Sequence, residues 1–317
     1  MRRLTGLSPE QKGNRHPAFR CFAEVGQMRQ FYVITNCEKD KDLETTGQIY
    51  NYLRQRGCAC EVREYQRRNH PSGETDWKYT DDSWIPQGTD CILVLGGDGT
   101  LLQAARDTIN RKIPLLGINL GTLGFLAEIE KSGIPDALDS LLLDNYTIEP
   151  RMVLEGSVYR NGRETVKDIA LNDIVVNRSG ALRVIDYEIQ VNGEPLNRYS
   201  ADGMIVSTPT GSTGYSLSAG GPIISPMASM IVVTPICPHT LTARSIVLSG
   251  GDSVRVQIGS GRRSLHEEAF ATFDGEVPVP METGDYVEIH RSEKIVNILK
   301  ISKVSFLEVL RDKMRAN

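Results

Sequence analysis

The chain has 317 residues, of which 40% are hydrophobic and 24% charged, and its formal net charge is −4. This length is typical of two domains, and this composition is typical of a globular protein. The negative charge and the lack of long basic runs in the sequence argue against a nucleic-acid partner. No apolar run in the sequence reaches the ~18 residues of a membrane helix, so no membrane partner is expected.

The N-terminus predicts the compartment of the protein, and the cysteines and histidines show no pattern typical of a metal site. Arg2 and Arg3 are not followed by an apolar core, so no secretory signal is expected and the sequence predicts a cytoplasmic location. The six cysteines and five histidines are scattered without a metal-binding spacing. We therefore expect structural or surface roles for these residues.

The first half of the chain alternates strand and helix patterns. Residues 1–28 are polar and irregular and are expected to be flexible, and residues 66–89 are expected to form a long surface loop. A helix is predicted over about Lys39–Arg56, with Leu43, Tyr50 and Leu53 on one side. Strands are predicted at 31–35, 60–63, 91–95 and 113–118, and a further helix at 134–143. This alternation predicts a parallel, doubly wound sheet.

The pattern changes near Tyr146, after which short β-type runs predict an antiparallel β domain. Asn161-Gly162 and Asn192-Gly193 are typical of type I′ hairpins. A short helix is expected near 211–219, and a final helix at 304–314 with Phe306, Leu307 and Leu310 on one side. The runs that predict strands are 152–159, 169–177, 184–191, 254–258 and 286–289.

A glycine-rich loop, Gly96-Gly97-Asp98-Gly99-Thr100, directly follows the apolar run 91–95. Glycines at a strand end allow a tight turn and a close approach of the backbone to a ligand. Helix-forming residues follow, and a helix N-terminus favours phosphate. Asp98 would repel phosphate, so its presence fits a group that holds a metal or takes a proton from an attacking hydroxyl. On its own, the loop is also compatible with an ordinary connection from strand to helix.

Three further segments place polar residues beside strands. Residues 117–126 contain three glycines and Asn119, and they form either a ligand loop or a loop packed on its neighbour. Asn172 and Asp173 interrupt an apolar strand and need partners, either ribose hydroxyls or a turn backbone. Residues 201–222 carry seven Ser or Thr hydroxyls, five glycines and Tyr215. This last segment predicts a hydroxyl-lined pocket with an aromatic wall for a base or nicotinamide ring.

Taken together, these segments closely resemble the NAD kinase family, whose members use ATP to make NADP from NAD. GGDGT also occurs in lipid kinases, whereas TPTGSTGYSLSAGGP is far more specific to NAD kinases. The resemblance covers most of the chain, from about Phe31 to Leu310. The matching pieces are GGDGT at 96–100, GxNxGxLGFL at 117–126, LND at 171–173, DGMIVSTPTGSTGYSLSAGGP at 202–222 and FDGE at 273–276.

The resemblance implies the NAD kinase/diacylglycerol kinase-like fold. Residues 29–145 would form a doubly wound α/β domain, and residues 146–302 an all-β sandwich domain. The C-terminal helix, 303–317, would pack back on the first domain, and the active site would lie between the two domains. The resemblance also implies NAD and ATP as ligands and a homodimer or homotetramer.

The resemblance implies a role for each matching residue. Asp98 would accept the proton of the 2′-hydroxyl on the adenosine ribose of NAD, and a divalent cation, Mg²⁺, would arrive with the ATP phosphates. Gly97, Gly99 and Thr100 would hold phosphates. Asn172 and Asp173 would hold ribose hydroxyls, and Asp202 would bind near the nicotinamide end. The other expected substrate-binding residues are Asn119, Arg183, Thr213, Gly214, Tyr215, Ser216, Ser218 and Glu276.

Two positions depart from common family patterns. Ser200 stands where many members carry a basic residue, and Gly214 stands where Ala is usual. Two other functions remain to be compared. A lipid kinase would share GGDGT but would need a long apolar tunnel, which the hydroxyl-rich stretch 207–218 does not favour. A non-catalytic dinucleotide sensor would keep the glycine loops but should have lost Asp98.

Overall fold

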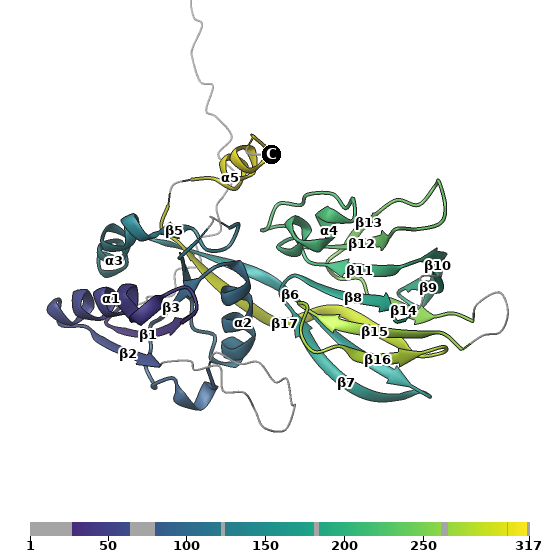
Figure 1. Cartoon of the computed structure of the whole chain (residues 1–317), viewed down its shortest axis with the longest axis horizontal. Helices are drawn as coiled ribbons and strands as arrows, with labels where there is room; N and C mark the ends of the chain where they lie inside the picture. Colours follow the sequence, from purple (N-terminus) through teal and green to yellow (C-terminus); the bar gives the residue numbers. More distant parts are fainter. Residues whose placement is uncertain are drawn as a thin grey trace, which may run out of the picture.

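The computed structural model of the chain describes residues 27–63, 80–121, 124–180, 184–260, 266–302 and 304–315. These residues form two lobes that lie side by side (Figure 1). The N-terminal lobe comprises the elements before residue 146, and the C-terminal lobe those from residue 147 to 285. Within the described residues, no helix is long and apolar enough to cross a membrane.

The N-terminal lobe contains a parallel sheet in the order β2-β1-β3-β4, with β5 beside β4. Its central strands are buried along nearly their whole length because helices cover both faces. The strands are β1 (Gln30–Thr35), β2 (Ala59–Arg63), β3 (Cys91–Gly96), β4 (Leu115–Asn119) and β5 (Ile129–Glu130).

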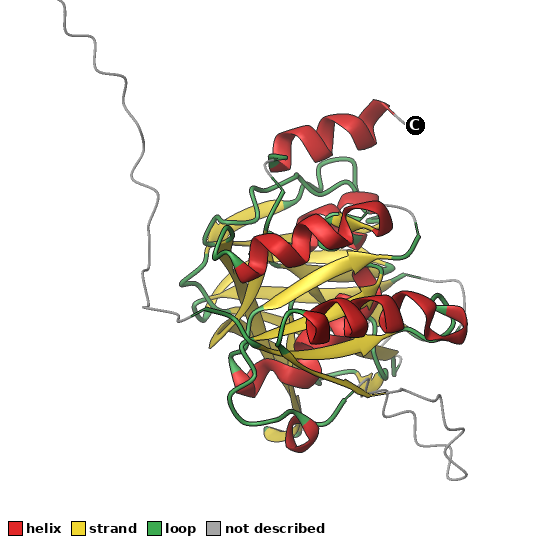
Figure 2. Cartoon of the chain, turned by 90° about the vertical axis from the view of Figure 1, so that its left-hand side faces the viewer, coloured by secondary structure: helices red, strands yellow, loops and turns green. Residues whose placement is uncertain are grey.

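Three helices complete this lobe. Helices α1 (Glu44–Gln55) and α3 (Ile134–Leu142) share one core cluster with the sheet. Helix α2 (Asp98–Thr108) packs on the opposite face, which is the side toward the C-terminal lobe (Figure 1). Figure 2 shows helices lying across the strands of the sheet. The 3₁₀ turns of the described chain are Lys41–Leu43, Asp82–Trp84, Ile109–Arg111, Lys131–Gly133 and Gly211–Thr213.

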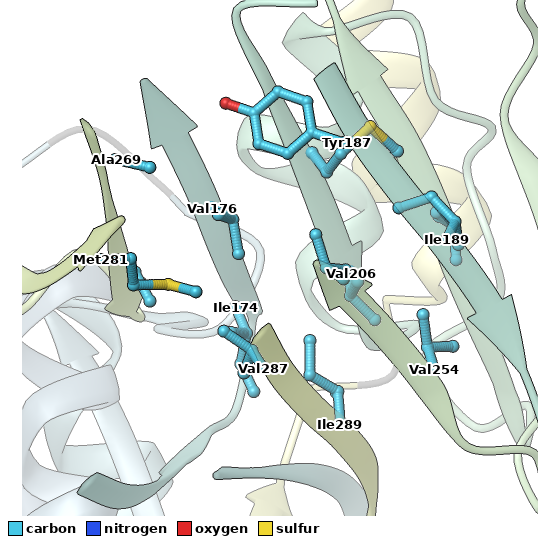
Figure 3. Close-up of a cluster of buried hydrophobic side chains, with 14 of the residues drawn as sticks. Ile174, Val176, Tyr187, Ile189, Val206, Val254, Ala269, Met281, Val287 and Ile289 are labelled. Carbon is cyan, nitrogen blue, oxygen red and sulfur yellow. The ribbon is translucent and has the colours of Figure 1, made fainter. Parts of the chain in front are cut away.

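The C-terminal lobe is a sandwich of two antiparallel layers. One layer is a six-stranded sheet in the order β13-β12-β11-β8-β15-β16, and the other contains β10-β9-β14-β17. Side chains such as Val176, Val206, Val254 and Ile289 meet between the layers (Figure 3). The strands are β6 (Thr147–Arg160), β7 (Arg163–Ala170), β8 (Asp173–Arg178), β9 (Ile185–Val191), β10 (Glu194–Ala201), β11 (Gly203–Ser207), β12 (Met230–Ile236), β13 (Ile246–Ser249), β14 (Val254–Ile258), β15 (Glu268–Phe273) and β16 (Val279–Glu282).

Strand β17 (Tyr286–Lys300) joins the two lobes. It pairs antiparallel with β14 and along most of its length with β6, and its Ile298 then pairs in parallel with Leu115 of β4. One eleven-stranded sheet therefore runs through both lobes. The sequence predicted only the first part of this strand, at 286–289.

The two remaining helices, α4 and α5, follow strands of the C-terminal half of the chain. Helix α4 (Tyr215–Ser218) follows β11, and helix α5 (Phe306–Arg315) ends the described chain. The ring of Phe306 approaches that of Phe125 in the N-terminal lobe, with 6.2 Å between the centroids. Thus α5 contacts the loop that follows β4.

The predicted fold class is confirmed, and so are both predicted hairpins. Asn161 and Asn192 have positive φ, as do the glycines that follow them. The expected strand over 169–177 is wrong as a single element, because β7 ends at Ala170 and β8 begins at Asp173. The intervening turn contains Asn172, and its polar side chain lies at a strand end.

The predicted apolar sides of two helices need correction. Leu43 is left-handed (φ 54°) and precedes α1, while Tyr50 is exposed and Ile49 is buried instead. In the C-terminal helix, Leu307 is 69% exposed. Residues 1–26 of the segment expected to be flexible and residues 66–79 of the expected surface loop lie outside the described residues, whereas Met28 is a fully buried core residue.

Ile289 gives a test of the sandwich core. It lies fully buried on β17, so Ile289→Ala should lower the free energy of unfolding by about 2–5 kcal/mol, through lost apolar contact and a cavity. Urea unfolding followed by circular dichroism measures this. Ile295→Ala, on the same strand but 38% exposed, is the matched control and should cost less than about 1 kcal/mol. Equal losses would contradict the assigned core.

Candidate active site

Asp98 is the first residue of α2, directly after the glycine turn that ends β3. Its Oδ2 accepts the backbone N–H of Phe125 at 2.8 Å. Its Oδ1 accepts those of Leu126 and Ala127, both at 3.1 Å. The carboxylate therefore fixes the loop after β4, and Oδ2 keeps one acceptor position because a carboxylate oxygen has two.

Gly124 makes this arrangement possible. A Cβ placed on Gly124 would lie 1.9 Å from Oδ1 of Asp98, far inside van der Waals contact. Only a residue without a side chain lets this loop approach the carboxylate so closely.

The other residues of the glycine loop divide into two groups. Gly97 and Gly99 have at least part of their backbone exposed. The Thr100 side chain is different, because its residue is 4% exposed and its Oγ1 lies 3.5 Å from the N of Gly97 and 3.4 Å from Nδ2 of Asn36. This hydroxyl therefore stabilises the turn, and the expected contact of Thr100 with phosphate stays a prediction.

Lys39 is a residue that sequence reasoning missed. Its Nζ lies 3.0 Å from the position that a Cβ on Gly97 would take, so its ammonium group lies against the glycine loop. The signal was its place in the loop after β1, at the carboxyl edge of a parallel sheet, where such sheets bind ligands.

Asn119, at the end of β4, supports the second glycine loop. The residue is 3% exposed, and its Oδ1 accepts the N–H of Gly121 at 2.9 Å. Its Nδ2 has no hydrogen-bond partner among the described residues. The N–H of Leu120 donates to Gly96 O at 2.8 Å, so the two glycine loops are tied together.

The Leu171-Asn172-Asp173 turn is held by Asp274, which sequence reasoning did not assign. The Asp274 carboxylate accepts all three backbone N–H groups of this turn at 2.7 to 3.1 Å. Asp274 itself has φ 53° and is followed by Gly275 at φ 77°, as in a type I′ turn. The signal in the sequence was the Asp-Gly pair inside the FDGE piece.

The hydroxyl-rich segment packs directly on this turn. The N–H of Thr208 donates to Asn172 O at 2.8 Å, and the Thr208 hydroxyl donates to Leu171 O at 2.6 Å. A Cβ on Gly211 would lie 2.1 Å from Asn172 O, so the backbones are in close contact. The structure thus brings together two motifs that are almost 40 residues apart in the sequence.

The electrostatics of this region are dominated by two buried carboxylates. Burial, and secondly the charge of Asp274, raises the pKa of Asp173 to about 7. Burial also raises the pKa of Asp274, while Arg106 and the three N–H donors act in the opposite direction. Asp173 thus titrates in the neutral range.

Two cavities lie along the loops described above, and only the second borders the two buried carboxylates. One, of about 160 Å³, lies between the lobes and is lined by Phe125, Thr210, Thr213 and residues of β6, β17 and α5. The buried Oγ1 of Thr210 has no hydrogen-bond partner among the described residues. The other, of about 340 Å³, is lined by Asn172, Asp173 and Tyr215 among others.

Of the residues expected from the sequence, Thr213 lines the first cavity and Asn172, Asp173 and Tyr215 line the second, whereas Gly214 and Ser218 line neither. Gly214 lies beside the first turn of α4, where its Cβ position is 3.7 Å from Nδ2 of Asn172. Tyr215 is 44% exposed, and Ser218 is exposed at the end of α4. Phe125 was part of a matching motif but was not assigned a role. Its ring is open enough to be contacted by Lys313, whose Nζ lies 5.0 Å from the ring centroid.

Several expected residues do not join this arrangement. Ser216 is fully buried and its hydroxyl lies 3.2 Å from that of Thr234, and its expected contact with the substrate stays a prediction. Asp202 pairs with Arg178 at 2.6 Å. Asp202 directly precedes β11, whereas Asp173 pairs with Ser207 at the other end of that strand. Asp202 and Ser207 are therefore about 16 Å apart along β11. Arg183 lies outside the described residues.

Glu276, an expected substrate-binding residue, does not line either of these two cavities. It lines a separate cavity of about 600 Å³ beside α2, together with Arg106 and Asp168. The structure therefore does not place Glu276 with Asn172 and Asp173, although the three residues share one end of the six-stranded sheet.

Comparison with known proteins identifies the family. Residues 31–146 match the ATP-NAD kinase N-terminal domain and residues 171–301 the ATP-NAD kinase C-terminal domain. The NAD kinase of Lachnospira eligens is 47% identical over 298 residues, covering 90% of this chain and all of that protein. The NAD kinase of Lachnoclostridium phytofermentans is 43% identical over 288 residues, covering 90% of this chain and 99% of that protein.

Solved structures agree with this result. The crystal structure of yeast NADH kinase complexed with NADH has a TM-score of 0.77 at 25% identity and covers 92% of this chain and 89% of its own. An NAD kinase from Archaeoglobus fulgidus in complex with ATP shares the fold, with a TM-score of 0.69 at 24% identity, covering 91% of this chain and 99% of its own. The lipid-kinase and sensor alternatives find no support in these comparisons. The chain therefore belongs to the NAD kinase family and is a kinase that phosphorylates NAD.

Proposed function

We propose that phosphate transfer from ATP to the 2′-hydroxyl of the adenosine ribose of NAD takes place between the lobes, next to Asp98. One observation carries this proposal. The carboxylate of Asp98 is bonded to the same loop, Phe125–Ala127, whose first two residues line the interlobe cavity. A substrate in that cavity would lie beside the carboxylate.

The interlobe cavity suits an adenine ring. The face of Phe125 offers a surface on which a base stacks, and stacking on an aromatic ring suits every base. The Thr210 hydroxyl has no hydrogen-bond partner among the described residues, so it offers a hydrogen-bonding group to a ring nitrogen or to the amino group of adenine. Thr213 lines the same space.

The second cavity suits the nicotinamide half of the dinucleotide. Asn172 and Asp173 offer acceptors for ribose hydroxyls, and the exposed ring of Tyr215 offers a wall for the nicotinamide. Gly214 caps the start of α4 and Ser218 is its last residue, so both would lie near a dinucleotide that contacts Tyr215. The dinucleotide would thus follow the hydroxyl-rich segment.

The phosphates fit the glycine loop. The N-terminus of α2, an eleven-residue helix that begins at Asp98 directly after Gly97, leaves backbone N–H groups of its first turn without partners inside the helix, and its dipole favours anions. The ammonium of Lys39 adds a positive charge against the same loop. Phosphoryl transfer depends mainly on positioning and charge neutralisation, which these groups supply.

Asp98 acts on the attacking hydroxyl. The free acceptor position of Oδ2 takes a hydrogen bond from the 2′-hydroxyl and orients its oxygen toward the γ-phosphorus. The new P–O bond forms while the bond to the leaving ADP breaks, and the hydroxyl proton passes to Asp98. Because a carboxylate is a weak base for an alcohol, we infer that proton transfer is late and that orientation is the larger contribution.

Three further features belong to this proposal. ATP would bind with a divalent cation, Mg²⁺, which is commonly held by substrate phosphates and few protein carboxylates. The chain would form a homodimer or homotetramer, and the expected contact of Asp202 near the nicotinamide end stays a prediction, since Asp202 lies about 16 Å along β11 from the partner of Asp173. A cytoplasmic location stays a prediction from the sequence.

Asp98→Asn tests the central residue. The amide is a far poorer proton acceptor, so turnover should fall about a hundredfold or more. NADP formed from NAD, ATP and Mg²⁺ is measured with an NADP-specific dehydrogenase, and thermal unfolding checks that the variant is folded. Unchanged turnover in a folded variant would remove Asp98 from the mechanism.

Gly124→Ala tests the position of the carboxylate without changing its chemistry. The new methyl group would force the Asp98 carboxylate away, and such a displacement should lower kcat by about ten- to a hundredfold. Gly121→Ala in the same loop is the matched control, because the nearest atom to its Cβ would be 4.0 Å away. If both variants keep full activity, the loop does not position Asp98.

The raised pKa of Asp173 predicts a pH dependence of stability. The fold favours protonated Asp173, so its contribution is present at low pH and is lost as pH rises from about 4 to about 7. The slope for one proton is at most ~1.4 kcal/mol per pH unit. Urea unfolding between pH 5 and 8 should show this loss in the wild type relative to Asp173→Asn. Parallel pH profiles would show that Asp173 titrates normally.

A further inference from the structure

Arg106 connects the two lobes through a single side chain. It lies in the last turn of α2 in the N-terminal lobe, and its side chain is 13% exposed. Its Nη1 donates to Ile169 O, and its Nη2 donates to Oδ2 of Asp168 at 2.7 Å. Both acceptors belong to β7 in the C-terminal lobe.

The same guanidinium faces the buried carboxylate of Asp274. Nη1 of Arg106 lies 3.8 Å from Oδ2 of Asp274, whose side chain is 1% exposed. A buried carboxylate is costly unless it is paired and hydrogen-bonded. Arg106 is therefore the counter-charge for the group that holds the turn of residues 171–173.

We propose that Arg106 and Asp274 are positioning residues that set the distance between Asp98 and the turn carrying Asn172 and Asp173. Asp98 is the first residue of helix α2, and Arg106 lies about 12 Å further along the helix axis. Arg106 holds the helix against Asp274 through their ion pair, and Asp274 holds the turn through three hydrogen bonds. This inference rests on the proposed function, because it assumes that both ends contact the dinucleotide.

The geometry explains why arginine occupies this position. Its planar fork reaches a backbone carbonyl, Asp168 and Asp274 at once, which a single ammonium group cannot do. Without Arg106, the charge of Asp274 stays buried and uncompensated. Without Asp274, three N–H groups of the turn lose their acceptor, and the backbone under Asn172 and Asp173 is released.

The test combines binding and turnover in the full chain. Arg106→Gln should raise the Kd for NAD, measured by calorimetry without ATP, about tenfold and should lower kcat as well. Arg106→Lys should recover part of both losses, because it keeps the charge near Asp274. Arg56→Gln is the matched control: Arg56 pairs with Asp139 at 3.0 Å within the N-terminal lobe, and its loss should leave both values unchanged.

A double-mutant cycle decides whether the two residues act together. Asp274→Asn should weaken NAD binding by a similar factor, and adding Arg106→Gln should weaken it little further. Independent, multiplying losses would overturn the proposal, and so would an unchanged Kd in folded Arg106→Gln. If Asp274→Asn does not fold, the Arg106 variants alone decide, because a purely structural role would lower the melting temperature without changing Kd.

This outcome is distinguishable from failure of the proposed function. If Asp98 is not the proton acceptor, Asp98→Asn keeps its turnover, while the binding defect of Arg106→Gln remains. If the turn of residues 171–173 does not contact NAD, Asn172→Ala leaves the Kd for NAD unchanged. A binding loss in Asn172→Ala without one in Arg106→Gln rejects only the coupling.

Discussion

Two aspartates, each bonded to three consecutive backbone N–H groups, hold the site of this kinase together. Asp98 binds residues 125–127 in the N-terminal lobe, and Asp274 binds residues 171–173 in the C-terminal lobe. Each bond set turns a flexible loop into a fixed one, because charged acceptors make stronger hydrogen bonds than neutral ones. The loops that these aspartates fix are the ones that line the two cavities proposed for NAD.

The two carboxylates differ in burial, and this difference separates their roles. Asp98 is partly exposed and keeps an acceptor position free for a hydroxyl. Asp274 has a side chain that is 1% exposed, faces Arg106 and makes its bonds inside the protein. The same side chain in two environments thus suits the proposed proton acceptor at one place and holds a turn at the other. Asp173 is buried beside Asp274, and this burial, together with the charge of Asp274, raises the pKa of Asp173.

The sequence could predict the parts that depend on neighbouring residues. Asp98 was found because a strand, a glycine turn and a helix follow one another within 15 residues, and Asn172 and Asp173 were found because they interrupt an apolar run. Arg106 acts through residues more than 60 positions away, so local pattern gives no signal for it. For Asp274, the Asp-Gly pair signals only a turn, because the three N–H groups that its carboxylate accepts lie more than 100 positions away. Thr100 and Ser216 show the converse: their types suit a ligand, but tertiary packing turned both hydroxyls inward.

The shared strand β17 has a consequence for how substrates reach the site. Because β17 is hydrogen-bonded to β6 and β14 in one lobe and to β4 in the other, rotation of the lobes would break a continuous sheet. The spacing of the catalytic groups is thus built into the architecture. A dinucleotide bound between the lobes would then enter and leave past surface segments such as α5, whose Phe306 lines the interlobe cavity, without rotation of the lobes.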